Sequence, residues 1–235
     1  MKIEKEEIGS SLLSTIIDNQ AMELIADLGE VAIDDLLKDG TLKDIPILGD
    51  LLKLYNLGVG VRDFLFLQKL MKFLHQLKEI PEADKEQFVN KVKGDKKFKK
   101  LTGENLILIL ERLDDLNKPE LVGKAFCAYV EEKITYDEFI LLSTAIDRTR
   151  ISDIKALEKI SVSWIFSGNS DWEHRLANCD LMTIDVEFRL SLEPGIQRET
   201  KIMYKRNSLN QLLSAVCLKN DQETLTWLEY RKKYP

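Results

Sequence analysis

Two histidines are the residues of this chain best suited to acid–base or metal chemistry near neutral pH. His174 follows Asp171 by three residues, so both side chains share one face if this segment is helical. Such a pair could bind a metal ion or transfer a proton, but either site needs further ligands or an orienting group. His75 stands in an apolar helical pattern. We therefore interpret His75 as structural or interfacial and His174 as part of a surface polar cluster.

A second set of candidates for chemistry consists of carboxylates. Asp171, Asp185 and Glu187, followed by Arg189, loosely resemble the core of a magnesium-dependent nuclease. Such a core needs a lysine where Arg189 stands, and the alternation of Asp185 and Glu187 with apolar residues is typical of the solvent face of a strand. The chain has neither a P-loop nor a G-x-S-x-G motif. The sequence therefore favours a non-enzymatic protein without catalytic, cofactor-binding or metal-binding residues.

A dense run of basic residues is a candidate for binding. It consists of Lys91, Lys93, Lys96, Lys97, Lys99 and Lys100, with Phe98 inside it. Lysines near an anionic membrane surface contribute about 1 kcal/mol each, and lysines also bind phosphates. A solvated turn between two helices explains the same run. The sequence leaves both interpretations open.

Residues 45–77 form the most apolar long segment of the chain. Charged residues interrupt it, and its longest uncharged run, residues 54–61, is too short for a bilayer, which takes about 18 or more apolar residues. Residues 62–77 carry apolar side chains on two sides of a helix, which is typical of a helix buried between layers. The segment is therefore either the centre of a soluble helical core or a region that meets a membrane or a partner conditionally.

The composition indicates a helix-rich, well-solvated chain. Of the 235 residues, 44% are hydrophobic, which allows a sizeable core, and 31% are charged. The net charge of −6 argues against a general nucleic-acid binder. Three widely spaced cysteines, together with an N-terminus that lacks an apolar signal segment, predict a cytoplasmic protein with reduced thiols.

Helical periodicity dominates the first 149 residues, which we expect to form one helical domain. The clearest local signal is the capping box of Thr135 and Glu138, which predicts a helix start before Phe139. Residues 45–47 contain a proline at their centre and are predicted to be extended. Apolar spacing predicts helices over residues 10–38, 62–77, 85–92, 105–116 and 119–130.

The pattern changes over residues 150–235. Helical patterns around residues 154–160 and 172–178 precede an alternating strand, residues 182–192, and a second strand over residues 200–204. A helix is then predicted to begin at Ser208. The segments RLANCDLMTIDVEFRL, EPG and TKIMYKRNSLNQLL resemble the end of a winged-helix domain, where a helix runs into a two-stranded wing. This resemblance, over residues 153–218, implies contact with nucleic acid or with protein.

The expected fold is therefore mostly α, with a helical domain over residues 1–149 and a small winged-helix-like α+β domain over residues 150–235. The helix before the wing has mixed charge, unlike the basic and amide-rich faces that read DNA. If the wing did bind nucleic acid, the contacts would come from its basic residues. These are Arg189, Arg198, Lys201, Lys205 and Arg206.

The predicted function is a non-enzymatic adaptor or regulatory subunit that acts through protein–protein contacts, with self-association through apolar helix faces as a further option. Trp164, Trp172 and Trp227 are the candidate interface residues, because tryptophans are frequent in binding hot spots. One alternative is an effector that inserts residues 45–77 into a membrane after a trigger. The other is a nucleic-acid-binding regulator that uses the wing. None of these functions requires a cofactor.

Overall fold

The computed structural model describes residues 2–28, 44–54, 60–158, 165–167, 171–189 and 199–218. These residues are mostly helical and include one small antiparallel sheet, which confirms the mostly α prediction. Their contacts divide the chain into two compact units, residues 1–139 and 140–235. The boundary predicted at residue 149 lies at the end of helix α9, Tyr136–Arg148, which this division cuts.

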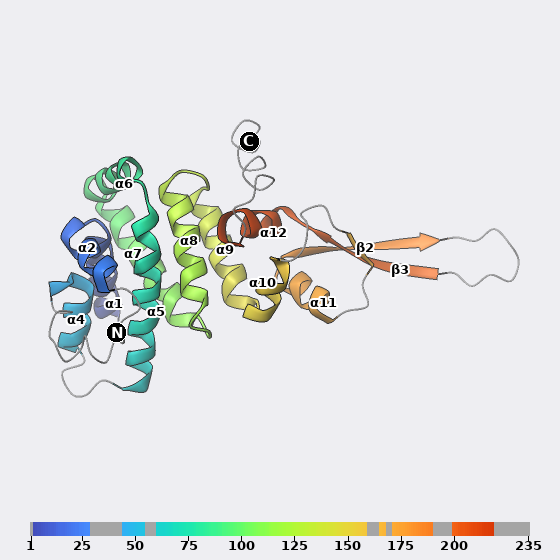
Figure 1. Cartoon of the computed structure of the whole chain (residues 1–235), viewed down its shortest axis with the longest axis horizontal. Helices are drawn as coiled ribbons and strands as arrows, with labels where there is room; N and C mark the ends of the chain where they lie inside the picture. Colours follow the sequence, from blue (N-terminus) through green and yellow to red (C-terminus); the bar gives the residue numbers. More distant parts are fainter. Residues whose placement is uncertain are drawn as a thin grey trace, which may run out of the picture. The chain divides into compact units, whose positions relative to one another are not determined.

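The first unit is built from helices (Figure 1). Its helix α1 packs against α7 and α4, while α5 packs against α8. The elements are α1 (Lys2–Ile16), α2 (Asn19–Leu28), α4 (Pro46–Leu54), α5 (Val61–Gln76), the 3₁₀ turn η2 (Leu77–Glu79), α6 (Glu82–Gly94), α7 (Lys96–Arg112), α8 (Lys118–Val130) and the first turn of α9.

Three local predictions need correction in the first unit. The pattern over residues 10–38 predicted one helix, but α1 ends at Ile16 and α2 begins at Asn19. The break occurs because the Asp18 carboxylate accepts hydrogen bonds from the amides of Gln20 and Ala21, which start a new helix. Pro46 was predicted to be extended but is the first residue of α4, a position that tolerates its missing N–H.

The third correction concerns the lysine run, which is helical rather than a turn. Only Asp95 separates α6 from α7, and its side chain accepts a hydrogen bond from the amide of Phe98 at 2.9 Å. The capping box predicted at Thr135 is confirmed. The Thr135 amide donates to Glu138 Oε2 at 2.9 Å, and the Glu138 amide donates to Thr135 Oγ1 at 3.3 Å.

Helix α5 supplies much of the core of the first unit. Leu67, Leu70, Met71, Phe73 and Leu74 are its buried residues. Phe73 belongs to a cluster of aromatic rings drawn from α5 to α9, with Phe73 and Phe126 centroids 5.7 Å apart and Phe126 and Phe139 centroids 5.4 Å apart. This cluster accounts for the apolar Phe73, whereas Leu65, another apolar residue outside the main stripe of residues 62–77, is 40% exposed.

Two glycines allow α1 and α7 to touch backbone to backbone. A Cβ on Gly103 would lie 2.2 Å from the carbonyl oxygen of Gly9, and a Cβ on Gly9 would lie 2.7 Å from the amide nitrogen of Glu104. Neither distance is compatible with a side chain. The crossing of these two helices therefore depends on glycine at both positions.

The second unit combines short helices with a sheet. It contains α10 (Ile151–Leu157), β1 (Ile165–Ser167), α11 (Asp171–Asn178), β2 (Met182–Arg189), β3 (Glu199–Arg206), α12 (Ser208–Leu213) and the π-helical turn η3 (Ser214–Leu218). The strand order is β1-β3-β2, with both pairs antiparallel. The alternating strand, the second predicted strand and the helix predicted from Ser208 are present. Strand β1 was not predicted, because three residues are too few to show a period.

Strands β2 and β3 form a long two-stranded ribbon, called the β2–β3 ribbon below. Val186 lies opposite Ile202, and Ile184 lies opposite Tyr204. Strand β1 pairs with β3 only from Met203 to Lys205. Within the described part of the sheet, the half of the ribbon that precedes Met203 in β3 therefore consists of two strands. Figure 1 shows the ribbon extending away from α10, α11 and α12.

Candidate functional site

In the structure, some lysines of the run contact side chains of neighbouring helices, and others face solvent without a partner among the described residues. The ammonium group of Lys91 lies 4.7 Å from the ring centre of Phe98 and 5.5 Å from that of Tyr129, and it donates to the Tyr129 hydroxyl at 3.3 Å. Lys99 donates to Ser14 Oγ of α1 at 3.0 Å. Both side chains thus connect helices.

Phe98 and Tyr129 form the inner side of this arrangement. The Phe98 ring packs edge-on against Phe88 at 6.2 Å and against Tyr136 at 6.5 Å. Burial raises the pKa of the Tyr129 hydroxyl, and the hydrogen bond and positive charge of Lys91 oppose that rise. Phe98 therefore belongs to the aromatic cluster of the first unit, and the exposed Lys91 side chain lies over the edge of this cluster.

Lys93, Lys96 and Lys97 behave differently, and they are called the three free lysines below. Each of them is exposed, and none makes an ion pair or side-chain hydrogen bond with another described residue. Lys100, the remaining member of the run, is exposed but has an interaction partner. The unpaired positive charge of the run is thus concentrated next to Asp95, where α6 ends and α7 begins.

An apolar stripe on α7 adjoins this corner. Leu101 is 50% exposed and Leu108 is 41% exposed. Leu101 follows Lys97 by four residues, and Leu108 follows it by eleven. All three positions therefore fall on one side of the helix. The exposed side of α7 is therefore basic at Lys97 and apolar at Leu101 and Leu108.

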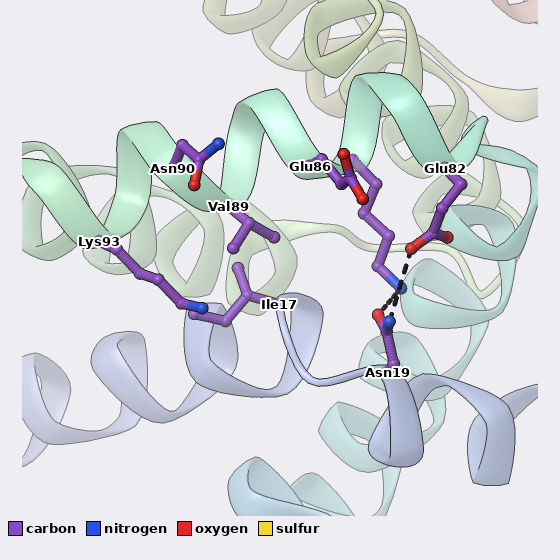
Figure 2. Close-up of a pocket in the computed structure, with 8 residues that line it drawn as sticks. Ile17, Asn19, Glu82, Glu86, Val89, Asn90 and Lys93 are labelled. Carbon is purple, nitrogen blue, oxygen red and sulfur yellow. Dashed lines mark hydrogen bonds between the residues drawn. The ribbon is translucent and has the colours of Figure 1, made fainter.

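A shallow surface pocket of about 320 Å³ lies between the α1–α2 connection and α6 (Figure 2). At one end, Asn19 accepts a hydrogen bond from Lys85 at 2.7 Å and donates to Glu82 at 3.5 Å. Val89 and Ile17 point toward each other in its middle, and Lys93 lies at the other end. Its lining contains two lysines and two glutamates, so the pocket favours neither anions nor cations.

The basic residues predicted for the wing are not equivalent in the structure. Lys205 makes an ion pair with Asp185 across the ribbon. Arg206 is buried: its Nε donates to Asn210 Oδ1 at 2.5 Å, and its Nη2 donates to Ser214 Oγ. Arg198 lies outside the described residues.

The other two basic positions of the ribbon lie opposite acidic residues. In the strand register, Lys201 is opposite Glu187, and Arg189 is opposite Glu199. Cross-strand pairs of opposite charge stabilise antiparallel strands. Among the described side chains of the ribbon, Lys205 is thus ion-paired, and the Arg206 side chain is not available at the surface.

One face of the β2–β3 ribbon carries exposed aliphatic side chains. Ile184 is 50% exposed, Val186 is 41% exposed and Ile202 is 42% exposed. Val186 and Ile202 are directly opposite, and Ile184 is two residues from Val186, so the three residues share one face. This group is called the aliphatic face below. The alternation of β2 predicted such a face, but only the structure shows that it is left open to solvent.

The histidines have partners that sequence spacing did not indicate. The ring nitrogens of His174 lie 2.5 and 2.7 Å from the hydroxyl oxygen of Tyr204, a buried residue of β3. His75 Nε2 lies 2.8 Å from Lys78 Nζ. Among the described residues, no group of three or more histidine, cysteine or acidic side chains is arranged to hold a metal ion.

Two acidic residues of the second unit are engaged in structural contacts. Asp153 is buried and accepts two hydrogen bonds from Arg175, each of 2.7 Å. This bidentate pair joins α10 to α11. Asp185, the other carboxylate considered for hydrolysis, pairs with Lys205, whose ammonium group keeps the pKa of Asp185 below its ordinary value.

The apolar segment predicted at residues 45–77 contains α4 and α5, separated by residues 55–59, which lie outside the described part. The charges of α5 bind neighbouring helices: Lys72 pairs with Glu120 at 3.0 Å, Arg62 pairs with Glu111 at 2.9 Å, and Lys69 donates to the carbonyl oxygens of Glu111 and Leu113. In the described ranges, no helix combines the length and the apolar character needed to cross a bilayer.

Burial protects two of the three thiols, and this predicts their reactivity. Burial raises the pKa of the Cys127 thiol to about 12, while Cys179 is half-buried and Cys217 is buried. We expect iodoacetamide to label Cys179 first at pH 8. Cys127 should remain unmodified until the chain unfolds, because the thiolate is the reactive form. Peptide mapping by mass spectrometry measures this order, and early labelling of native Cys127 would contradict it.

Comparison of the chain with protein-family models, with curated proteins and with solved structures finds no match. Its candidate sites are therefore defined by geometry alone. They are the aliphatic face of the β2–β3 ribbon in the second unit and the corner of the three free lysines in the first.

Proposed function

We propose that this chain is a non-enzymatic adaptor or regulatory subunit, and that it binds a protein partner through the aliphatic face of the β2–β3 ribbon. The observation that carries the proposal is the exposure of Ile184, Val186 and Ile202 on one face of this ribbon. Contiguous exposed aliphatic side chains are typical of surfaces that bind another protein.

The two-stranded part of the ribbon gives a physical reason for a partner. An isolated pair of strands is marginally stable in water, because it buries little apolar surface. Val186 and Ile202 lie in the part of the ribbon that β1 does not reach. Covering them would remove aliphatic surface from water, at about 25 cal/mol per Å², and would stabilise the pairing of the two strands.

The resemblance to a winged helix is consistent with this proposal. Helix α11 runs into the β2–β3 ribbon, the arrangement that the resemblance implies for a helix and its wing. A wing that met nucleic acid would present unpaired basic side chains to phosphates. In this ribbon Lys205 is ion-paired and Arg206 is buried, which favours a protein partner over nucleic acid.

Membrane insertion of residues 45–77 has less support. Insertion would expose the buried side of α5, including Phe73 and Leu74, and would separate Lys72 from Glu120. Among the predicted interface tryptophans, Trp172 is half-buried and has a partner within the chain, and Trp164 and Trp227 lie outside the described residues. Self-association remains an option for the aliphatic face itself.

The test is affinity purification of the tagged full-length chain from its native cells, with nuclease treatment. We expect a stoichiometric protein partner, or a second copy of the chain, that is lost in a Val186→Asp and Ile202→Asp double variant. Leu141→Asp is the matched control, because Leu141 is 55% exposed in the same unit but lies on α9. A partner captured equally by all three proteins would exclude the aliphatic face as its binding surface.

A further inference from the structure

We propose that the corner between α6 and α7 docks on an anionic lipid surface, through the ammonium groups of Lys93, Lys96 and Lys97 and the side chain of Leu101. This interaction is separate from the protein contact proposed for the ribbon. It concerns the first unit only, and it requires no rearrangement of the helical core.

The unpaired state of the three free lysines is the first argument. Most lysines of the first unit that are named above lie near a carboxylate, a carbonyl oxygen, a hydroxyl or a ring: Lys72 pairs with Glu120, Lys69 donates to carbonyl oxygens, and Lys91 lies over aromatic rings. Lys93, Lys96 and Lys97 have none of these contacts with described residues. Their charge is therefore available to a ligand outside the chain.

The position of two of these lysines is the second argument. Lys96 and Lys97 begin α7, where the helix dipole is positive and basic residues are unfavourable. Asp95 caps this end, but the first turn of α7 contains no acidic residue. The arrangement lowers the stability of the helix end and raises the local positive potential. An anionic surface placed against it would offset both effects.

The choice of a lipid surface over a nucleic acid follows from the neighbouring side chains. Phe98, the aromatic residue of the run, packs on Phe88 and Tyr136 and lies under the Lys91 ammonium group, so it is not free to stack on a base. The run contains no arginine, the residue that binds phosphates in a bidentate manner. Leu101, which is 50% exposed one turn after Lys97, fits the acyl region below lipid headgroups.

The experiment compares full-length proteins in a vesicle sedimentation assay. The vesicles are phosphatidylcholine alone or phosphatidylcholine mixed with phosphatidylserine, at low and high salt. We expect binding to the anionic vesicles only, weakening as salt rises. Changing Lys93, Lys96 and Lys97 to glutamate should reduce the partition coefficient roughly a hundredfold, since each lysine near such a surface contributes about fivefold.

A charge-matched control separates the corner from net charge. Lys53, Lys124 and Lys155 are exposed lysines elsewhere in the chain, and their change to glutamate alters the total charge by the same amount. We expect this control to retain most of the binding. A Leu101→Ser variant should weaken binding about fivefold, because it removes the apolar contact, while Leu141→Ser, which changes a similarly exposed leucine, should not. Circular dichroism verifies that all variants are folded.

Three outcomes would overturn the proposal. One is wild-type protein that does not sediment with anionic vesicles. The second is an equal loss of binding in the corner variant and the charge-matched control, which would show a general effect of charge. The third is binding of a duplex or single-stranded oligonucleotide that needs the three lysines, with no vesicle binding, which would assign the corner to nucleic acid.

Discussion

Replacing Gly103 with alanine is expected to destabilise the first unit by about 3 kcal/mol or more. The added Cβ would lie 2.2 Å from the Gly9 carbonyl oxygen and 2.5 Å from its carbonyl carbon. Both are backbone atoms of α1 and cannot rotate away. The two helices would have to separate, and the packing around their buried residues, such as Leu12 of α1 and Leu106 of α7, would loosen.

Gly94 provides the matched control for this prediction. It is the last residue of α6, and a Cβ placed on it would meet no atom within 4 Å. Gly94→Ala should change the free energy of unfolding by less than about 1 kcal/mol. Chemical denaturation followed by far-UV circular dichroism measures both variants. Equal midpoints for the two variants would show that α1 and α7 do not approach as closely as described.

The two units can be followed separately in this experiment. All three tryptophans, Trp164, Trp172 and Trp227, belong to the second unit, whereas the long helices that dominate the circular dichroism signal belong to the first. Gly103→Ala should therefore lower the denaturation midpoint measured by circular dichroism. A shift of the tryptophan fluorescence midpoint by the same amount would show that the units unfold together.

Replacing Arg206 with alanine is expected to destabilise the second unit by about 3 kcal/mol. The change removes a buried guanidinium group and leaves Asn210 Oδ1 and Ser214 Oγ without their donor. Asn210 Nδ2 is already buried without a partner among the described residues, so the site has little capacity to rearrange its hydrogen bonds. The midpoint of tryptophan fluorescence during denaturation measures the effect.

Lys205 is the control, because it is adjacent in sequence and carries the same charge. Its ion pair with Asp185 is close to half exposed on both sides, and pairs of this kind contribute about 0–1 kcal/mol. Lys205→Ala should therefore have a small effect on stability. If both variants lost stability equally, the burial of Arg206 would not be the property that distinguishes them.

The sequence predicted the elements that depend on neighbouring residues. The alternation of β2 placed its strand correctly, and the capping box of Thr135 and Glu138 placed the start of α9. Both are local interactions, with partners within a few residues of one another. The errors at Asp18, Pro46 and the lysine run also have local causes, since each concerns the start of a helix. Asp18 was predicted inside a longer helix, Pro46 in an extended segment, and the lysine run in a turn.

The candidate binding surfaces could not be predicted from local sequence patterns alone. By sequence, the lysines of residues 91–100 are alike, and so are the basic residues of the ribbon. Which of them are free depends on residues far away in the chain. Lys91 contacts Tyr129, Lys99 contacts Ser14, and Lys205 contacts Asp185.

The sequence by itself therefore determined a mostly helical chain with a β2–β3 ribbon near its end, because side-chain periodicity follows directly from backbone geometry. Only the tertiary structure decided that Gly9 and Gly103 meet, that Arg206 is buried beside an ion-paired Lys205, and that Lys93, Lys96 and Lys97 remain unpaired. These properties depend on distances between helices and strands. Such distances are set by packing of the whole unit, which no local period encodes.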